Sequence, residues 1–323
     1  MAPSSAFVTH MLQNPVPTYL LGTLPAILTI GAAPFSSLKL KVSHIFICLA
    51  SPFVGLFYFV NINFGEDGDD QDVVDACVYW LNCNRFEGGI WPFGYRVQAI
   101  DARPNNQNVP LPKALRSCIA NASVLDRFAS LASAYYIVVG IALGIYRAAG
   151  PCDIQEWPYI PLLLTWTLPA ILIRIFKGKI VAKNPEEELN EDMLISVRKL
   201  SNENVRSIRE NVLSILVLSS LIPWVAVIIA YLTRPKGFGC RSKYLTGFCS
   251  VWTFNSIVAF VYYYLGNRPP PGVNTDQDRV YIWFQVCGFV VAVFLVILAV
   301  LSNNPSYWVN MFGDACDTSA CFT

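Results

Sequence analysis

The sequence predicts an all-α membrane protein, a multi-pass bundle of about seven transmembrane helices. Of the 323 residues, 54% are hydrophobic and only 14% are charged, whereas soluble domains have roughly 45–50% and about 25%. The apolar residues are also gathered into runs close to the roughly 20 residues that a membrane-spanning helix needs. So few charges could not solvate a protein of this size, and we therefore expect lipid to cover much of its surface.

The expected spans divide the chain into helices and two longer loops. The loops, 65–127 and 177–211, contain too few apolar residues to form a core of their own. Residues 1–323 are therefore expected to form a single membrane domain. Four prolines lie well inside spans, away from the end turns, and should kink them, either through ordinary packing or around a cavity: Pro25, Pro52, Pro169 and Pro223. The seven spans are expected at about 16–35, 42–64, 128–147, 158–176, 212–233, 245–266 and 280–302.

Each loop contains a segment with helical character. Residues 73–81 are expected to form a helix on the membrane interface, with Trp80 as its anchor. In the second loop, Asn184 can cap a helix and Pro185 suits its first position. Apolar residues then recur at helical spacing up to Val212, which predicts an amphipathic helix leading into the fifth span.

The distribution of Lys and Arg predicts the orientation in the membrane. The loops after the second, fourth and sixth spans, together with Arg174 at the end of the fourth span, hold 16 of the 23 basic residues. The positive-inside rule therefore places these loops and the N-terminus in the cytosol and the C-terminus outside. The sequon at Asn121 points the other way, but it lies too close to the third span for glycan transfer to be expected. We expect the endoplasmic reticulum membrane.

The cysteine, histidine and charge content excludes some classes of site. The ten cysteines form no C-x-x-C pair, and only two histidines accompany them, so no metal site and no cofactor are expected. Cys77 with Cys83, and Cys316 with Cys321, are possible disulfides if their loops face an oxidising compartment. The net charge of +1 is too small to favour a nucleic-acid partner.

The acidic residues lie near helix ends rather than at mid-membrane. This disfavours an ion-coupled transporter, which would be expected to bury a charge there. A carboxylic acid at the mouth of the bundle could donate a proton to a substrate, although a solvated acidic loop is the simpler interpretation. The candidate catalytic acids are Asp126, Asp153, Glu156 and Glu66.

Aromatic and amide side chains lie inside the spans and could line a substrate cavity. Aromatic faces stabilise cations, as a pocket that folds a carbocation must, but packing explains most such residues equally well. Asn255 and Gln285 are the central polar residues, and they could join helices or face a cavity. The candidate substrate-binding residues are Trp166, Trp224, Trp252, Tyr262, Asn255 and Gln285.

With its size, kinked aromatic-rich spans and carboxylates confined to helix ends, the chain resembles the small integral-membrane terpene cyclases of filamentous fungi that act in meroterpenoid pathways, nearest to the ascofuranone/ascochlorin type. The resemblance implies cofactor-independent cyclisation of a lipophilic prenylated substrate, often an epoxide, started by an Asp or Glu. Two alternatives stay open. One is a seven-span transporter or receptor for a lipophilic molecule. The other is a magnesium-dependent prenyltransferase of the UbiA type, suggested by acidic groups at 66–75 and at Asp276 and Asp278.

Overall fold

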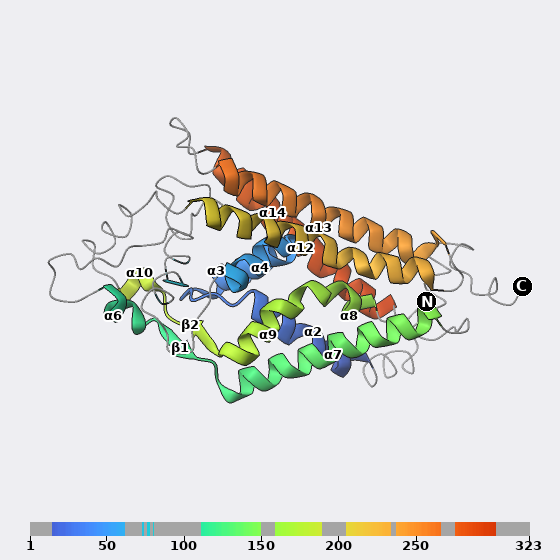
Figure 1. Ribbon diagram of the computed structural model, residues 1–323, viewed down its shortest axis with the longest axis horizontal. Helices are drawn as coiled ribbons and strands as arrows, with labels where there is room; N and C mark the ends of the chain where they lie inside the picture. Colours follow the sequence, from blue (N-terminus) through green and yellow to red (C-terminus); the bar gives the residue numbers. More distant parts are fainter. Residues whose placement is uncertain are drawn as a thin grey trace, which may run out of the picture.

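The computed structural model is a bundle of helices with one small two-stranded sheet (Figure 1). It describes residues 15–61, 73, 76, 77, 80, 111–149, 159–188, 205–233, 237–265 and 275–301. The main helices are α2 (Pro15–Ile30), α3 (Leu38–Ala50), α4 (Pro52–Asn61), α7 (Val124–Ala149), α8 (Tyr159–Leu163), α9 (Leu168–Lys177), α12 (Val205–Leu232), α13 (Cys240–Leu265) and α14 (Thr275–Leu301). A 3₁₀ turn, η1 (Leu164–Thr167), joins α8 to α9, and α6 (Leu111–Arg116), α10 (Pro185–Glu188), β1 (Ile119–Asn121) and β2 (Lys179–Val181) complete the described elements.

Five segments are long and apolar enough to cross a membrane, as expected of a multi-pass membrane protein. They are Val124–Tyr146, Tyr159–Lys177, Val212–Leu232, Ser242–Val261 and Ile282–Ala299. All five coincide with predicted spans. The described part of α2 is shorter, at 16 residues, and α3 and α4 form a bent pair. The expected count of seven crossings is therefore confirmed only in part.

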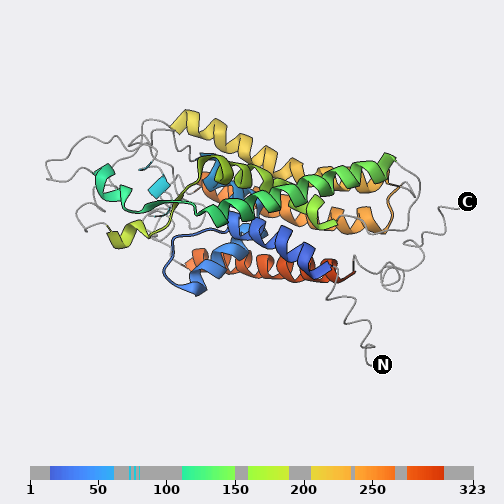
Figure 2. The same cartoon turned by 90° about the horizontal axis from the view of Figure 1, so that it is seen from below.

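The two ends of the bundle differ, and we call them the sheet end and the far end. The sheet end carries β1 and β2, which pair antiparallel with Ile119 opposite Val181, and it also holds the start of α7 and the end of α9 (Figures 1 and 2). From there α7 runs to the far end, where a Cβ added at Gly144 would lie 3.4 Å from Ile229, near the end of α12. α13 returns to the sheet end, and α14 starts there.

The predicted second span, 42–64, is not one continuous helix. α3 and α4 are bent by 107° at Ser51. The ring centroids of His44 in α3 and Tyr58 in α4 lie 5.3 and 5.1 Å from that of Trp80, although a straight helix would separate 14 residues by about 21 Å. The chain thus enters from the sheet end, turns inside the bundle and comes back toward the same end.

The packing of α3 on α14 shows the direction of α3. Gln285 donates a hydrogen bond to the Ser43 hydroxyl, and the rings of Phe46 and Phe289 meet at 5.8 Å. The contacts advance along both helices in the same direction, from Ser43 with Gln285 to Phe46 with Phe289, so the two helices are parallel. Because α14 starts at the sheet end, α3 starts there too. Lys39 and Lys41 therefore lie at the same end as Lys177 and Lys179, whereas the seven-span prediction separates these pairs.

Gly288 permits the close approach of α14 to α3, and its replacement should be costly. A Cβ at Gly288 would overlap the backbone carbonyl group and Cα of Phe46, which cannot rotate away. We expect Gly288→Ala to destabilise the fold by about 1–3 kcal/mol, as overpacking does. Gly247→Ala is the matched control, since nothing lies within 4 Å of an added Cβ there. Thermal unfolding in detergent should show a lower midpoint for Gly288→Ala only, and equal midpoints would contradict the packing.

Large apolar side chains cover the outward faces of the spanning helices. Leu125 and Phe128 in α7, Leu221 in α12, and Phe254 in α13 are all more than half exposed. A face of this kind on a soluble monomer would promote aggregation, whereas lipid solvates it. The exposed surface thus agrees with the lengths of the helices.

Candidate functional site

The break between α3 and α4 lies in the middle of the bundle and is held by side chains of α13. Ser51 has extended backbone angles, φ −142° and ψ 111°, as expected for a residue that precedes a proline. The break leaves carbonyl groups of α3 without helical partners. Trp252 Nε1 donates to the Leu49 carbonyl oxygen at 2.7 Å, and Asn255 Nδ2 donates to that of Ala50 at 3.0 Å.

The other side of the break is held in the same way. The hydroxyl oxygens of Ser256 and Ser51 lie 3.2 Å apart, and the backbone N–H of Phe53 donates to the Ser256 hydroxyl at 3.4 Å. The Asn255 carboxamide oxygen accepts a hydrogen bond from Trp283 Nε1 at 3.2 Å. Both ends of the Asn255 amide are thus engaged, which makes this residue a joint between α3, α13 and α14.

Buried rings surround the break, and we call Phe53, Phe57, Trp166, Phe248 and Trp252 the aromatic core. Trp252 meets Trp166 at 5.7 Å and Phe248 at 5.1 Å between ring centroids, both edge to face. Phe53 meets Phe57 at 5.6 Å. Trp166 is fully buried, and its Nε1–H has no hydrogen-bond partner. A buried donor without a partner is costly, so a ligand oxygen at this position would be favourable.

The other predicted substrate-binding residues divide into two groups. The structure brings Trp166, Trp252 and Asn255 together at the break. Trp224 is only partly buried and donates to the Thr253 hydroxyl at 2.9 Å, whereas Gln285 joins α14 to α3 through Ser43. The side chain of Tyr262 lies outside the described residues.

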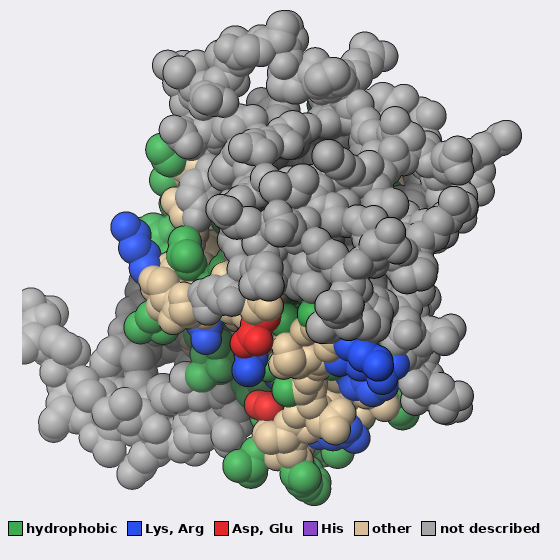
Figure 3. All heavy atoms as spheres, turned by 90° about the vertical axis from the view of Figure 1, so that its left-hand side faces the viewer, with side chains coloured by type: hydrophobic (Ala, Val, Ile, Leu, Met, Phe, Trp, Pro, Cys, Tyr) green, Lys and Arg blue, Asp and Glu red, His purple; other side chains and the backbone are tan. Residues whose placement is uncertain are grey.

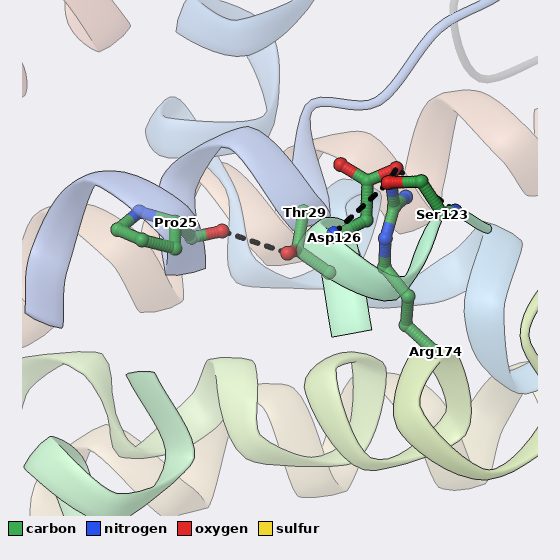
Figure 4. Close-up of polar contacts among 5 residues, drawn as sticks. All are labelled: Pro25, Thr29, Ser123, Asp126 and Arg174. Carbon is green, nitrogen blue, oxygen red and sulfur yellow. Dashed lines mark hydrogen bonds and ion pairs between the residues drawn. The ribbon is translucent and has the colours of Figure 1, made fainter. Parts of the chain in front are cut away.

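Asp126 is the one predicted acid whose side chain the structure describes, and it caps α7 (Figure 4). Its carboxylate accepts hydrogen bonds from the Ser123 hydroxyl at 2.8 Å and the Ser123 backbone N–H at 3.2 Å. In return, the Asp126 N–H donates to the Ser123 hydroxyl at 3.1 Å, which completes a capping box. Arg174 Nη2 lies 4.0 Å from the same carboxylate. Since donors surround this group, we assign it a structural role rather than that of proton donor.

Removing the cap should destabilise α7 modestly. We expect Ser123→Ala to lower the free energy of unfolding by about 1 kcal/mol, the usual effect of losing an N-cap hydroxyl. Ser117→Ala is a suitable control, because that hydroxyl is exposed, donates to the Ala114 carbonyl oxygen and lies outside the cap of α7. Chemical unfolding in mixed micelles measures both variants, and a Ser123→Ala protein as stable as the control would contradict the capping assignment.

A second set of side chains, the sheet-end cluster, comprises Phe35, His44, Tyr58, Trp80 and Arg174. Trp80 is 1% exposed and packs on Phe35 at 5.8 Å as well as on His44 and Tyr58. The prediction that Trp80 anchors an interfacial helix is therefore wrong, because this ring is buried inside the protein.

The remaining polar candidates lie mostly outside the described residues. Glu66, Asp153 and Glu156 are among them, so their predicted role as acids stays a prediction. Asp276 and Asp278, expected in a loop, fall instead in the first turn of α14. Among the residues that the structure describes, no three His, Cys, Asp or Glu side chains form a group that could hold a metal ion.

The thiols of Cys77 and Cys118 lie together near the sheet. Cys77 is a free thiol, so the possible disulfide with Cys83, a residue outside the described ranges, is not formed. The hydrogen bond with Cys118, together with burial, raises the pKa of Cys77, and the same bond lowers the pKa of Cys118. The Cys316–Cys321 pair also lies outside the described residues.

No protein-family profile, curated protein sequence or solved structure matches this chain. The function must therefore be inferred from the residues themselves. Sequence reasoning found Trp252 and Asn255 but missed Ser51 and Ser256, which complete the break. The Ser-Pro step at 51–52 within an apolar run was the available signal.

Proposed function

We propose that this protein is a membrane-bound terpene cyclase that converts a prenylated, epoxidised substrate into a cyclic isomer by acid-initiated carbocation chemistry. The observation that carries the proposal is the aromatic core at mid-bundle, with the unpartnered Trp166 Nε1–H inside it. Aromatic rings attract a positive charge to their faces. They can therefore stabilise a carbocation in a place from which water, which would react with it, is excluded. The Trp166 N–H is suited to an epoxide oxygen, which is a hydrogen-bond acceptor.

The proposed reaction conserves the atoms of the substrate. An acid protonates the epoxide oxygen, the C–O bond breaks, and the electrons of a neighbouring alkene form the new C–C bond. A proton then leaves the carbon beside the final cation for water or the carboxylate that the acid has become, which leaves an alkene and an alcohol and restores the acid. Asp126 is disfavoured as the acid because it caps α7 and faces Arg174. We favour Asp153 and Glu156, which lie in the sequence between α7 and α8. The end of α7 and the start of α8 are at the far end of the bundle (Figure 1).

The charges of the described side chains suggest the orientation. Most basic side chains that the structure describes lie at the sheet end, whereas Lys243 lies toward the far end. Those at the sheet end are Lys39, Lys41, Lys113, Arg116, Arg127, Arg174, Lys177, Lys179 and Lys183. The positive-inside rule then assigns the sheet end to the cytosol and the start of α2 to the opposite side. This replaces the N-terminus-inside expectation, because the fold-back of α3 and α4 removes one crossing. A lipophilic substrate fits an endoplasmic reticulum membrane.

The test uses microsomes of yeast that express the protein, incubated with farnesylated phenols and their terminal epoxides in the presence of a chelator. We expect cyclised isomers of unchanged mass, absent from microsomes of yeast with an empty vector. No turnover of any of these compounds by folded protein would refute the cyclase. Product formation only with added magnesium and a prenyl diphosphate would instead favour the prenyltransferase.

One observation favours a second candidate, a transporter for a lipophilic molecule. Helices that break inside the membrane commonly mark binding sites in transporters, and α3 with α4 is such a helix. At this break, however, Trp252 and Asn255 bind the freed carbonyls of α3, so these groups are not open to an ion or a polar substrate. Binding of the epoxide without conversion, and its movement between vesicle compartments, would favour the transporter.

A further inference from the structure

Arg174 is a buried cation that its neighbours satisfy only in part. Its side chain is 10% exposed, and its one ion pair with a described residue, from Nη2 to Asp126, is long at 4.0 Å. The other terminal nitrogen, Nη1, is buried and has no hydrogen-bond partner. A guanidinium carries five N–H donors, and leaving buried donors of a charged group unmatched is costly. The site therefore lacks an acceptor.

The surroundings of Arg174 favour an acceptor with negative charge. Arg127, Lys177 and Lys179 lie on the adjoining ends of α7, α9 and β2, while Asp126 is the one carboxylate paired with Arg174 among the described residues. Figure 3 shows blue Lys and Arg side chains at several places on the described surface of this end, with red acidic side chains among them. A guanidinium binds the paired oxygens of a carboxylate or phosphate in a fixed geometry.

α4 connects this site to the aromatic core. Near its start, a Cβ added at Gly55 would lie 2.9 Å from the Trp166 ring. Toward its end, Tyr58 belongs to the sheet-end cluster beside Arg174. Trp166 and Arg174 are eight residues apart along one continuous span, about 12 Å at helical rise. A farnesyl chain is long enough to cover this distance, so one molecule can reach both unpartnered donors.

We propose that Arg174 binds an anionic oxygen group at the head of the lipophilic substrate, a carboxylate or a comparable group, while its prenyl tail extends along α4 to Trp166. This inference rests on the proposed function for the tail and adds the class of the head. It also gives the substrate a direction, with the polar head at the sheet end and the reacting terminus toward the far end. A phospholipid headgroup offers the same anionic oxygens, so the test must separate the two sources.

The test measures binding of a farnesylated benzoic acid and of its methyl ester to the whole protein in nanodiscs of phosphatidylcholine. Arg174→Gln should weaken binding of the acid about tenfold or more, the effect of one lost charged hydrogen bond, and leave the ester within about twofold. Lys113→Gln is the matched control, because it removes an exposed charge of α6 at the same end, outside the group of cations around Arg174. The double variant Arg174→Gln with Asp126→Asn keeps the pair neutral, so that the half-exposed Asp126 carboxylate is not left without its cation. It should show the same selective loss of acid binding.

Two results of the binding assay would overturn the proposal that Arg174 anchors the head. One is that the variants weaken binding of the acid and of the ester equally. The other is that folded Arg174→Gln and the double variant bind the acid as the wild type does. A third result would also overturn it. If phosphatidic acid is added to the nanodiscs, and Arg174→Gln loses this bound lipid in native mass spectrometry but binds the benzoate as the wild type does, then the site holds lipid. The binding assay needs no turnover. Wild-type protein that binds the acid through Arg174 but makes no isomer would refute only the cyclase, whereas a working cyclase in which both Arg174 variants keep the KM for the acid would refute only the anchor.

Discussion

Replacing Trp252 by alanine should have the largest effect on stability of any single change in the described core. The side chain is 1% exposed, contacts Trp166 and Phe248, and donates to the Leu49 carbonyl at the break. Loss of a buried Trp side chain costs about 3–5 kcal/mol, and the orphaned carbonyl adds to this. We expect Trp252→Ala to be poorly folded in detergent, with an unfolding midpoint well below that of the wild type.

Trp252→Phe separates the ring from its hydrogen bond. It keeps an aromatic side chain in the core but cannot donate to Leu49, so it should lose about 1–3 kcal/mol. Trp224→Phe is the matched comparison, since that partly buried Trp donates to the Thr253 hydroxyl instead of to a broken helix. If both Phe variants unfold at the same midpoint, the hydrogen bond to the break contributes no special stability.

Removing the general acid should nearly abolish cyclisation. Acid catalysis by a positioned side chain contributes about 10²–10⁴-fold to rate, and an amide cannot donate its proton in the same way. We expect either Asp153→Asn or Glu156→Gln to lose at least about 100-fold in turnover of the epoxide, with the protein folded and still binding substrate. Product quantification by mass spectrometry after a fixed incubation gives the ratio.

Glu188→Gln serves as the control for this series, because Glu188 pairs with Lys183 on the surface at the sheet end and should not affect turnover. Glu66→Gln tests the remaining candidate acid outside the described residues. Loss of product in Asp126→Asn alone, with folding intact, would place the acid at the sheet end and contradict the assignment of Asp126 as a helix cap.

The crossing helices were predictable because their signal is local. A run of apolar residues needs no knowledge of its partners, and the five spanning segments fall within a few residues of the ranges expected for α7, α8–α9, α12, α13 and α14. The path of 42–64 was not predictable in this way. Its apolar length fits a straight span, whereas contacts with residues far away in the sequence, such as that of Asn255 with Ala50, 205 positions away, hold the chain in its turned form.

The candidate site was predictable in residue type more than in role. Trp166, Trp252 and Asn255 were identified because polar and aromatic groups are unusual at mid-membrane, and they do meet. Their hydrogen bonds to a broken helix follow from a tertiary contact that no spacing encodes. Arg174 lies near the end of an expected span, where a long basic side chain usually snorkels to the interface, yet its side chain is nearly buried with a donor unmatched.

The fold-back of α3 and α4 is the central claim, since it brings Arg174, Tyr58 and the aromatic core into one path, and side-specific cysteine labelling tests it directly. Single cysteines at Leu38, Lys183 and Phe238, all exposed positions, would be introduced and labelled with a membrane-impermeant maleimide in sealed microsomes. The fold-back predicts that Leu38→Cys and Lys183→Cys label from one side and Phe238→Cys from the other. Labelling of Leu38→Cys from the side of Phe238→Cys would mean that 42–64 crosses the membrane, and would contradict the fold-back.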